Sequence, residues 1–104
     1  MTTVVETLGI DQEQIAAFCR RRHIQWLAVY GSVLRDDFRP ESDVDVLVEF
    51  EPGRTPGLAF FDLPDELSSL FGGHQIDLGT KRSLNRWIRN RVLAEAEVLY
   101  DATR

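Results

Sequence analysis

The chain has 104 residues and a formal net charge of −5, because 12 lysines and arginines are outnumbered by 17 aspartates and glutamates. This length fits one domain, residues 1–104, with a core large enough to fold without disulfides. The acidic balance argues against extended nucleic-acid binding, which needs many cations against the phosphates. No segment resembles a secretory signal or approaches the ~20 apolar residues of a membrane-spanning helix, so we expect a soluble, cytoplasmic protein.

The first part of the chain predicts a helix followed by a buried strand. Asp11 can cap a helix that runs to about residue 23, and Cys19, the single cysteine, lies on its apolar stripe. We therefore expect Cys19 in the core rather than as a reactive thiol. The apolar run 26–30 is rich in β-forming residues and predicts a buried strand, and residues 32–38 can form a brief helix after it.

The rest of the chain continues this alternation, which is typical of an α/β domain. A strand is predicted at 43–50, a surface loop at 51–57, and a helix at 58–71 with Pro64 in its first turn or at a kink. A short strand at 74–80, a helix at 83–93 and a last strand at 97–101 follow. Leu84, Ile88 and Trp87 are the expected apolar contacts of that last helix.

Two of these strands place aspartates opposite an apolar face. In the segment DVDVLVEF the side chains alternate, so Asp43 and Asp45 lie opposite three valines, and Asp77 lies opposite its apolar neighbours in the later strand. Carboxylates held close together repel one another unless cations are present, and Mg²⁺ prefers such oxygen ligands together with substrate phosphates. A metal-free, solvated acidic face is the alternative interpretation, and for an isolated D-x-D it is the favoured one.

The pair Gly31-Ser32 follows the first strand directly. A glycine there lets the backbone approach a ligand, and the free N–H groups of a helix that starts at Ser32 favour a phosphate. An ordinary strand-to-helix turn, with Ser32 as the N-cap, is the alternative.

Positive charges gather in two places in this acidic chain. Arg20, Arg21 and Arg22 close the first predicted helix, where cations stabilise the C-terminal end. A second group lies at Lys81, Arg82, Arg86, Arg89 and Arg91. The second group is either a solvated helix face or a local field for a nucleotide, RNA or an acidic partner.

The combined spacing of these motifs resembles the minimal nucleotidyltransferase (MNT) branch of the DNA polymerase β-like nucleotidyltransferase superfamily. The stretch YGSVLRDDFRPESDVDVLVEF is similar to its Gly-Ser and Asp-x-Asp region, and IDLGTKRSLNRWIRNRVLAEAEVLY to its third-carboxylate strand, basic helix and closing strand. The resemblance spans residues 11–101. It implies an α/β (α+β) fold with a small mixed sheet of about four strands and helices packed on one face.

The resemblance assigns roles to six residues. The resemblance implies that Asp43 and Asp45 bind two Mg²⁺ ions, and that Asp77 completes the metal site and helps to deprotonate the attacking hydroxyl. Gly31 and Ser32 would hold the β- and γ-phosphates of ATP. Arg35 would reach the triphosphate from one helical turn further on, or form a surface ion pair instead. The family pattern has glycine where this chain has Asp36.

The implied reaction is transfer of AMP from ATP to a hydroxyl group, with release of diphosphate. Stand-alone members of the branch are commonly antitoxins that modify a tyrosine of a partner HEPN ribonuclease toxin. A non-catalytic antitoxin that masks its toxin, and an enzyme that modifies a small molecule such as an aminoglycoside, are the alternatives. The intact trio of aspartates favours an enzyme, and the absence of a second acceptor-binding domain counts against a small-molecule acceptor.

Five apolar residues are candidates for a surface that contacts such a partner. They are Leu58, Phe60, Phe61, Leu63 and Trp87. Core packing is the alternative for most of them, because apolar stripes at helical spacing usually face inward.

Overall fold

The computed structural model describes residues 4–35 and 38–102. Four α-helices, four β-strands and three short 3₁₀ helices (η) occur in these ranges. In chain order they are α1 (Val4–Leu8), α2 (Gln12–Arg21), β1 (Ile24–Tyr30), η1 (Gly31–Leu34), β2 (Val44–Phe50), η2 (Gly57–Asp62), α3 (Leu63–Leu70), β3 (Ile76–Thr80), η3 (Lys81–Ser83), α4 (Arg86–Glu95) and β4 (Glu97–Asp101).

The four strands form one mixed sheet in the order β3-β2-β1-β4. β1 pairs antiparallel with β2 and with β4, whereas β2 and β3 are parallel. Because β2 and β3 are parallel, their amino ends lie together, beside the carboxyl end of β1. This arrangement confirms the predicted mixed α/β sheet and brings three strand ends to one place.

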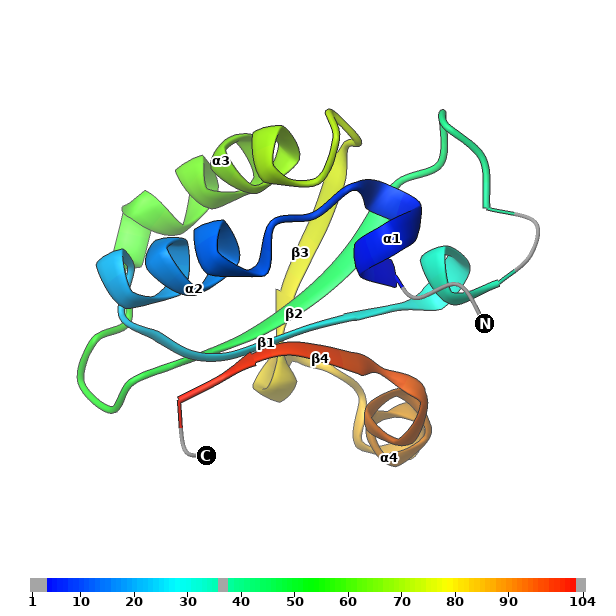
Figure 1. Ribbon diagram of the computed structural model, residues 1–104. Coiled ribbons are helices and arrows are strands. Elements are labelled where there is room, and N and C mark those ends of the chain that lie inside the picture. The colour runs from blue at the N-terminus through cyan, green and yellow to red at the C-terminus, as the bar shows by residue number, and fades with distance from the viewer. Residues whose placement is uncertain (1–3, 36–37, 103–104) are drawn as a thin grey trace.

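The two faces of the sheet are covered differently, as Figure 1 shows. Val44, Val46 and Val48 are completely buried on the face that packs against α1, α2 and α3. The opposite face carries a second, smaller cluster of Trp26, Ala28 and Leu47, against which residues of α4 pack. The expectation that all helices pack on one face of the sheet is therefore right for α1, α2 and α3 and wrong for α4. The segment between β3 and α4 leads the chain to the other face.

Local signals account for most helix ends. Asp11 caps α2 by accepting a hydrogen bond from the backbone N–H of Glu13 at 2.9 Å. The predicted helix at 58–71 is divided into η2 and α3, with Pro64 in the first turn of α3, where its missing N–H costs nothing. The brief helix after β1 is confirmed as η1, although it begins at Gly31 and ends at Leu34.

The last helix differs most from its prediction. It begins at Arg86 instead of residue 83, because Asn85 is its N-cap and accepts a hydrogen bond from the Trp87 backbone N–H at 2.8 Å. Trp87 is 79% exposed and Ile88 is 47% exposed, so their predicted role as packing contacts is wrong. The predicted contact of Leu84 is confirmed, and Val92 and Leu93 of α4 pack against the sheet in place of Trp87 and Ile88.

Other apolar positions separate into core and surface. Cys19 is fully buried, and burial raises the pKa of its thiol to about 12, so it is an inert core residue as predicted. Leu63, one of the candidates for a partner surface, is buried in the core. Leu58 and Phe61 are exposed, and Phe60 packs partly against the core.

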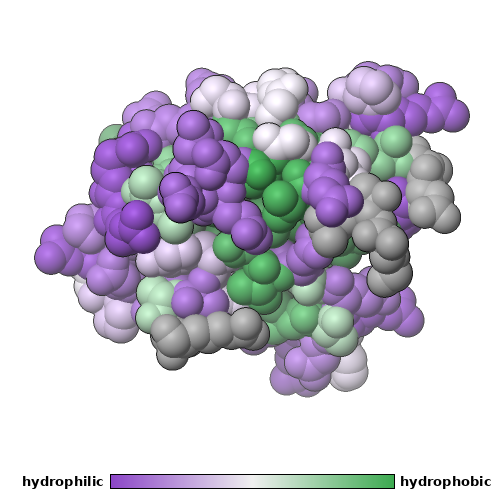
Figure 2. Space-filling model, viewed as in Figure 1, coloured by the Kyte–Doolittle hydropathy of each residue, from purple (hydrophilic) through white to green (hydrophobic). Residues whose placement is uncertain are grey.

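Some hydrophobic residues are exposed on the surface of the protein. Figure 2 shows a strip of them through the middle of one face, with hydrophilic residues on both sides. None of the helices within residues 4–35 and 38–102 is both long enough and apolar enough to cross a membrane.

Candidate active site

Three strand ends bring the predicted carboxylates together. Asp45 is opposite Tyr30 of β1 in the antiparallel register and opposite Asp77 of β3 in the parallel register. Residues paired in this way project from the same face of a sheet. Since Val44 and Val46 on either side of Asp45 are buried against the helices, Asp45 projects from the opposite face. The register therefore places Tyr30, Asp45 and Asp77 in one row.

Asp45 is the electrostatic centre of this row. Its half-buried position raises the pKa of its carboxyl group, and the neighbouring charge of Asp77, a side-chain hydrogen bond with Asp77 and the charge of Asp43 raise that pKa further. Arg35 opposes the rise, so its guanidinium acts on the same carboxyl group. All three predicted aspartates and Arg35 are thus electrostatically coupled through Asp45.

Tyr30 was not predicted from the sequence as a residue of the site. Its position directly before Gly31, at the end of the first strand, could have indicated it. Burial raises the pKa of its phenol group, and the negative charges of Asp45 and Asp77 raise it further. The phenol is therefore kept protonated and presents an uncharged donor beside the carboxylates.

The carboxylates provide only oxygen donors, which suits a hard divalent cation such as Mg²⁺. Within residues 4–35 and 38–102, no three His, Cys, Asp or Glu side chains are arranged as a ready-made metal site. Asp45 and Asp77 nevertheless interact directly. Burial is the main cause of the raised pKa of Asp45, and the charges of Asp77 and Asp43 add repulsion that a bound cation would offset. By its chemistry the donor set fits Mg²⁺, with Asp43 as the exposed third member.

Gly31 is needed at the junction of β1 and η1. Its φ is +78°, and a Cβ atom added there would overlap Asp45 Oδ2. Any other residue would thus displace the central carboxylate as well as strain the backbone. The glycine is what allows the turn backbone to approach Asp45 closely.

Ser32 and Arg35 lie at the two ends of the turn that follows. The Ser32 hydroxyl donates to the backbone carbonyl of Asp43 at 3.4 Å, which links η1 to the start of β2. Arg35 directly follows η1 and is exposed. With only four residues, η1 is too short for a strong helix dipole, so backbone N–H groups and the Ser32 hydroxyl are the donors that this turn offers a phosphate. Asp36, where the family pattern has glycine, lies outside the described residues.

A further residue, His74, positions the loop that carries Asp43. Its Nδ1 donates to the Ser42 carbonyl oxygen at 2.9 Å, and its ring lies 5.0 Å from the Phe38 ring. Next to this contact, the Val44 N–H donates a hydrogen bond to the carbonyl oxygen of Gln75, the residue after His74, at 2.9 Å. These contacts hold the start of β2 against the start of β3. No local sequence pattern pointed to His74, because its partners are more than 30 positions away.

Comparisons with known proteins agree with this arrangement. The sequence matches the family described as "Polymerase beta, Nucleotidyltransferase" over residues 13–104. It is 38% identical to the protein adenylyltransferase MntA of Thermococcus cleftensis, in an alignment that covers 91% of this chain and 94% of the relative. It is 32% identical to a Methanocaldococcus jannaschii protein provisionally named as a protein adenylyltransferase, with 96% of this chain and 99% of the relative covered.

Solved structures share the fold. A structure provisionally described as a minimal nucleotidyltransferase superposes with a TM-score of 0.72 at 38% identity, covering 89% of this chain and 93% of that one. The toxin-antitoxin complex MntA-HepT includes a chain that superposes with a TM-score of 0.61 at 19% identity, covering 88% of this chain and 71% of that one. The chain therefore belongs to the polymerase β nucleotidyltransferase family, as one of its minimal nucleotidyltransferases.

Proposed function

We propose that the protein is an antitoxin that transfers AMP from ATP to a tyrosine hydroxyl of a partner HEPN ribonuclease toxin in the presence of Mg²⁺. The observation that carries the proposal is the row formed by Asp45 and Asp77, with Asp43 and Arg35 acting on the same carboxyl group. The relative from Thermococcus cleftensis is named a protein adenylyltransferase, which supports a protein acceptor. A solved complex of tri-AMPylated Shewanella oneidensis HEPN toxin with its MNT antitoxin supports the class of partner.

In this proposal the carboxylates organise the reacting groups. Asp43, Asp45 and Asp77 would hold Mg²⁺. When bound, the metal neutralises phosphate charge and favours ionisation of the attacking hydroxyl. Asp77, exposed at the edge of the row, accepts the proton of that hydroxyl.

The other residues of the turn bind the nucleotide. The backbone at Gly31 and the hydroxyl of Ser32 donate to the β- and γ-phosphates, and Arg35 adds a positive charge near them. The hydroxyl oxygen forms a bond to the α-phosphorus while the bond from that phosphorus to the bridging oxygen of the β-phosphate breaks. AMP is then esterified to the tyrosine, and diphosphate leaves with the electron pair of the broken bond.

The test uses the protein together with the HEPN protein that the proposal requires as the product of a neighbouring gene. The two are incubated with ATP and Mg²⁺, and the intact mass of the HEPN protein is followed by mass spectrometry. We expect its mass to increase by AMP units, and we expect the double variant Asp43→Asn/Asp45→Asn to lose this activity. Asp65→Asn, which removes an exposed carboxylate on α3, is the matched control and should transfer AMP normally.

The alternative of steric masking predicts a different result. If the double variant neutralises the toxin fully, and the wild-type protein leaves the toxin mass unchanged, the proposed transfer is wrong. In that case the exposed apolar residues Leu58, Phe61 and Trp87 become the first candidates for the masking surface.

A further inference from the structure

A cavity of about 590 Å³ lies at the opposite end of β2 from the carboxylates. Its lining includes Glu49 and Phe50 of β2, whereas Asp45 lies four residues earlier, roughly 13 Å along a strand. β3 ends at Thr80, which is opposite Val48, and the chain then turns into η3. The cavity therefore occupies the space beyond the carboxyl ends of two parallel strands, a common place for ligands in open α/β sheets.

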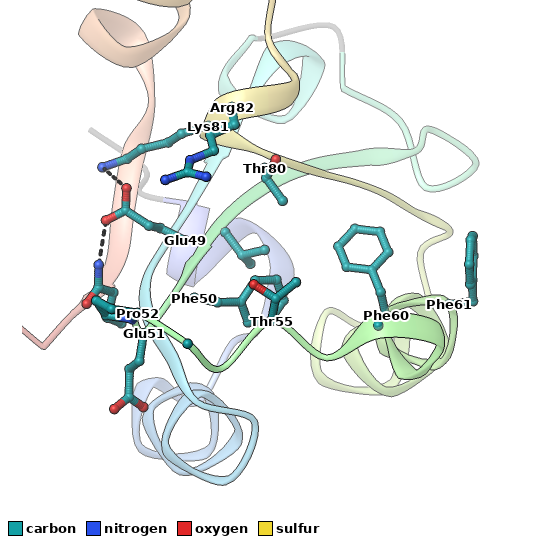
Figure 3. A pocket seen from close by; sticks show the side chains of 14 residues that line it. Glu49, Phe50, Glu51, Pro52, Thr55, Phe60, Phe61, Thr80, Lys81 and Arg82 are labelled. Atoms are coloured by element: carbon teal, nitrogen blue, oxygen red, sulfur yellow. Dashed lines mark hydrogen bonds and ion pairs between the residues drawn. The ribbon is translucent and has the colours of Figure 1, made fainter.

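The cavity has an aromatic side and a cationic side, which Figure 3 shows apart from one another. Phe50, Phe60 and Phe61 provide the aromatic side, with adjacent ring centroids 6.2 and 6.1 Å apart. Lys81 and Arg82 of η3 provide the cationic side. A volume in the range of small-molecule sites, with apolar walls and few polar groups, is typical of a ligand pocket.

The charges of the lining leave one cation available. Lys81 Nζ lies 3.7 Å from Glu49 Oε2 and 3.9 Å from the centre of the Trp26 ring, so its charge is already engaged. The side chain of Gln25 donates to the other oxygen of Glu49 at 2.8 Å. Glu51 lies 3.5 Å from His23 Nδ1 and points away from Arg82 in Figure 3.

Arg82 is left as the available cation. Among the described residues, its guanidinium has no ion pair within 4.0 Å. A guanidinium at the side of a cavity favours a carboxylate, sulfonate or phosphate group, which it can bind through two parallel hydrogen bonds. Opposite it, the exposed ring of Phe61 offers an apolar surface for the body of the same ligand.

We propose that this cavity binds a small organic anion that combines a flat apolar ring with one negatively charged group. The ring packs against the aromatic side of the cavity while the anionic group pairs with Arg82, and Thr55 and Thr80 supply hydroxyl groups between the two sides. The site uses none of the residues assigned to nucleotidyl transfer. Its existence is therefore independent of the proposed function.

The test uses a matched pair of fluorescent probes with the full-length protein. Anilinonaphthalene sulfonate carries an aromatic body and one negative charge, and phenylnaphthylamine is its uncharged counterpart. We expect saturable binding of the sulfonate, with amide chemical-shift changes centred on Gly53, Thr55, Thr80 and Arg82. The uncharged probe should bind more weakly at the same place.

Variants separate the two sides of the cavity. Arg82→Gln should weaken binding of the sulfonate about tenfold, as expected for loss of one charge-assisted contact, and leave the uncharged probe within twofold. Phe61→Ser should weaken both probes. Arg91→Gln removes the same charge from an exposed position on α4 and should change neither.

Three results would overturn the proposal. These are an absence of saturable binding, chemical-shift changes centred outside the cavity, and equal loss of sulfonate binding in the Arg82 and Arg91 variants. A thermal unfolding curve for each variant shows whether it is folded. Because Arg82, Phe61 and Arg91 are exposed, each variant is expected to retain the fold.

Discussion

The two ends of the parallel pair β2 and β3 carry opposite electrostatic arrangements. At the amino end, Asp45 and Asp77 are adjacent in the register, and the pKa of Asp45 is raised by burial and then by that neighbour. At the carboxyl end, Glu49 is paired with Lys81, which also lies over the Trp26 ring. At the amino end the carboxylates repel one another, and a bound cation can relieve that repulsion, whereas at the carboxyl end the Glu49 carboxylate already has a cationic partner. This difference favours the amino end, with its adjacent carboxylates, as the catalytic end of the strand pair.

The largest effect should come from Gly31→Ala. The added Cβ atom would push the Asp45 carboxylate out of the row, and the positive φ would cost about 1–2 kcal/mol for a residue with a side chain. We expect AMP transfer to fall at least about a hundredfold, since misplaced catalytic groups cost that much, together with a lower thermal midpoint.

Gly53→Ala is the matched control for this prediction. Gly53 has a φ of +76°, and a Cβ atom there would meet nothing within 4 Å. The control should show a similar loss of stability with full activity. If both variants keep activity, contact between the turn and Asp45 is not needed for transfer.

His74→Ala should have the next largest effect. Losing the hydrogen bond to the Ser42 carbonyl releases the loop that carries Asp43 and should lower AMP transfer about tenfold, with a stability loss of about 1 kcal/mol. The KM for Mg²⁺ should rise, which a purely structural role would not produce. His74→Asn, whose amide can still donate, should recover part of the activity, and equal activity in the two variants would argue against the positioning role.

Lys81→Ala tests the carboxyl end of β2 and β3, where Lys81 is paired with Glu49. Removing the contacts with Glu49 and Trp26 should cost about 1 kcal/mol, because both side chains of the ion pair are partly exposed and screened. AMP transfer should be unchanged. Urea unfolding measures the stability, and Lys81→Arg, which preserves the charge over the ring, should restore most of it. A large loss of activity in Lys81→Ala would contradict the separation of the two ends.

The smallest effect is expected in the dependence of stability on pH without divalent ions. The pKa of Asp45 is higher in the folded than in the unfolded protein, so its stabilising contribution is complete below the unfolded pKa and is lost as pH rises through the folded pKa. The stability of the wild type should therefore fall relative to Asp45→Asn as pH rises from about 4. Urea unfolding in EDTA measures the difference, and a difference independent of pH would contradict the raised pKa.

Local pattern alone determined much of this protein. The alternation in residues 43–50 correctly separated the buried valines from the aspartates, because side chains on a strand alternate with a period of two. Asp11 correctly marked a helix start, and Pro64 lies in a first turn, one of the two positions predicted for it, since capping and the missing proline N–H act within a few residues. The joint spacing of Gly31, Ser32, Asp43, Asp45 and Asp77 was enough to identify the family.

Only the tertiary structure decided how these parts meet. The register that pairs Asp45 with Asp77, the hydrogen bond from His74 to Ser42 and the packing of α4 on the second face all join residues distant in the chain. Trp87 has the apolar character of a core residue but is exposed, because α4 contacts the sheet through Val92 and Leu93 instead. Periodicity identifies a face of an element, whereas the choice of its partner depends on the packing of the whole chain.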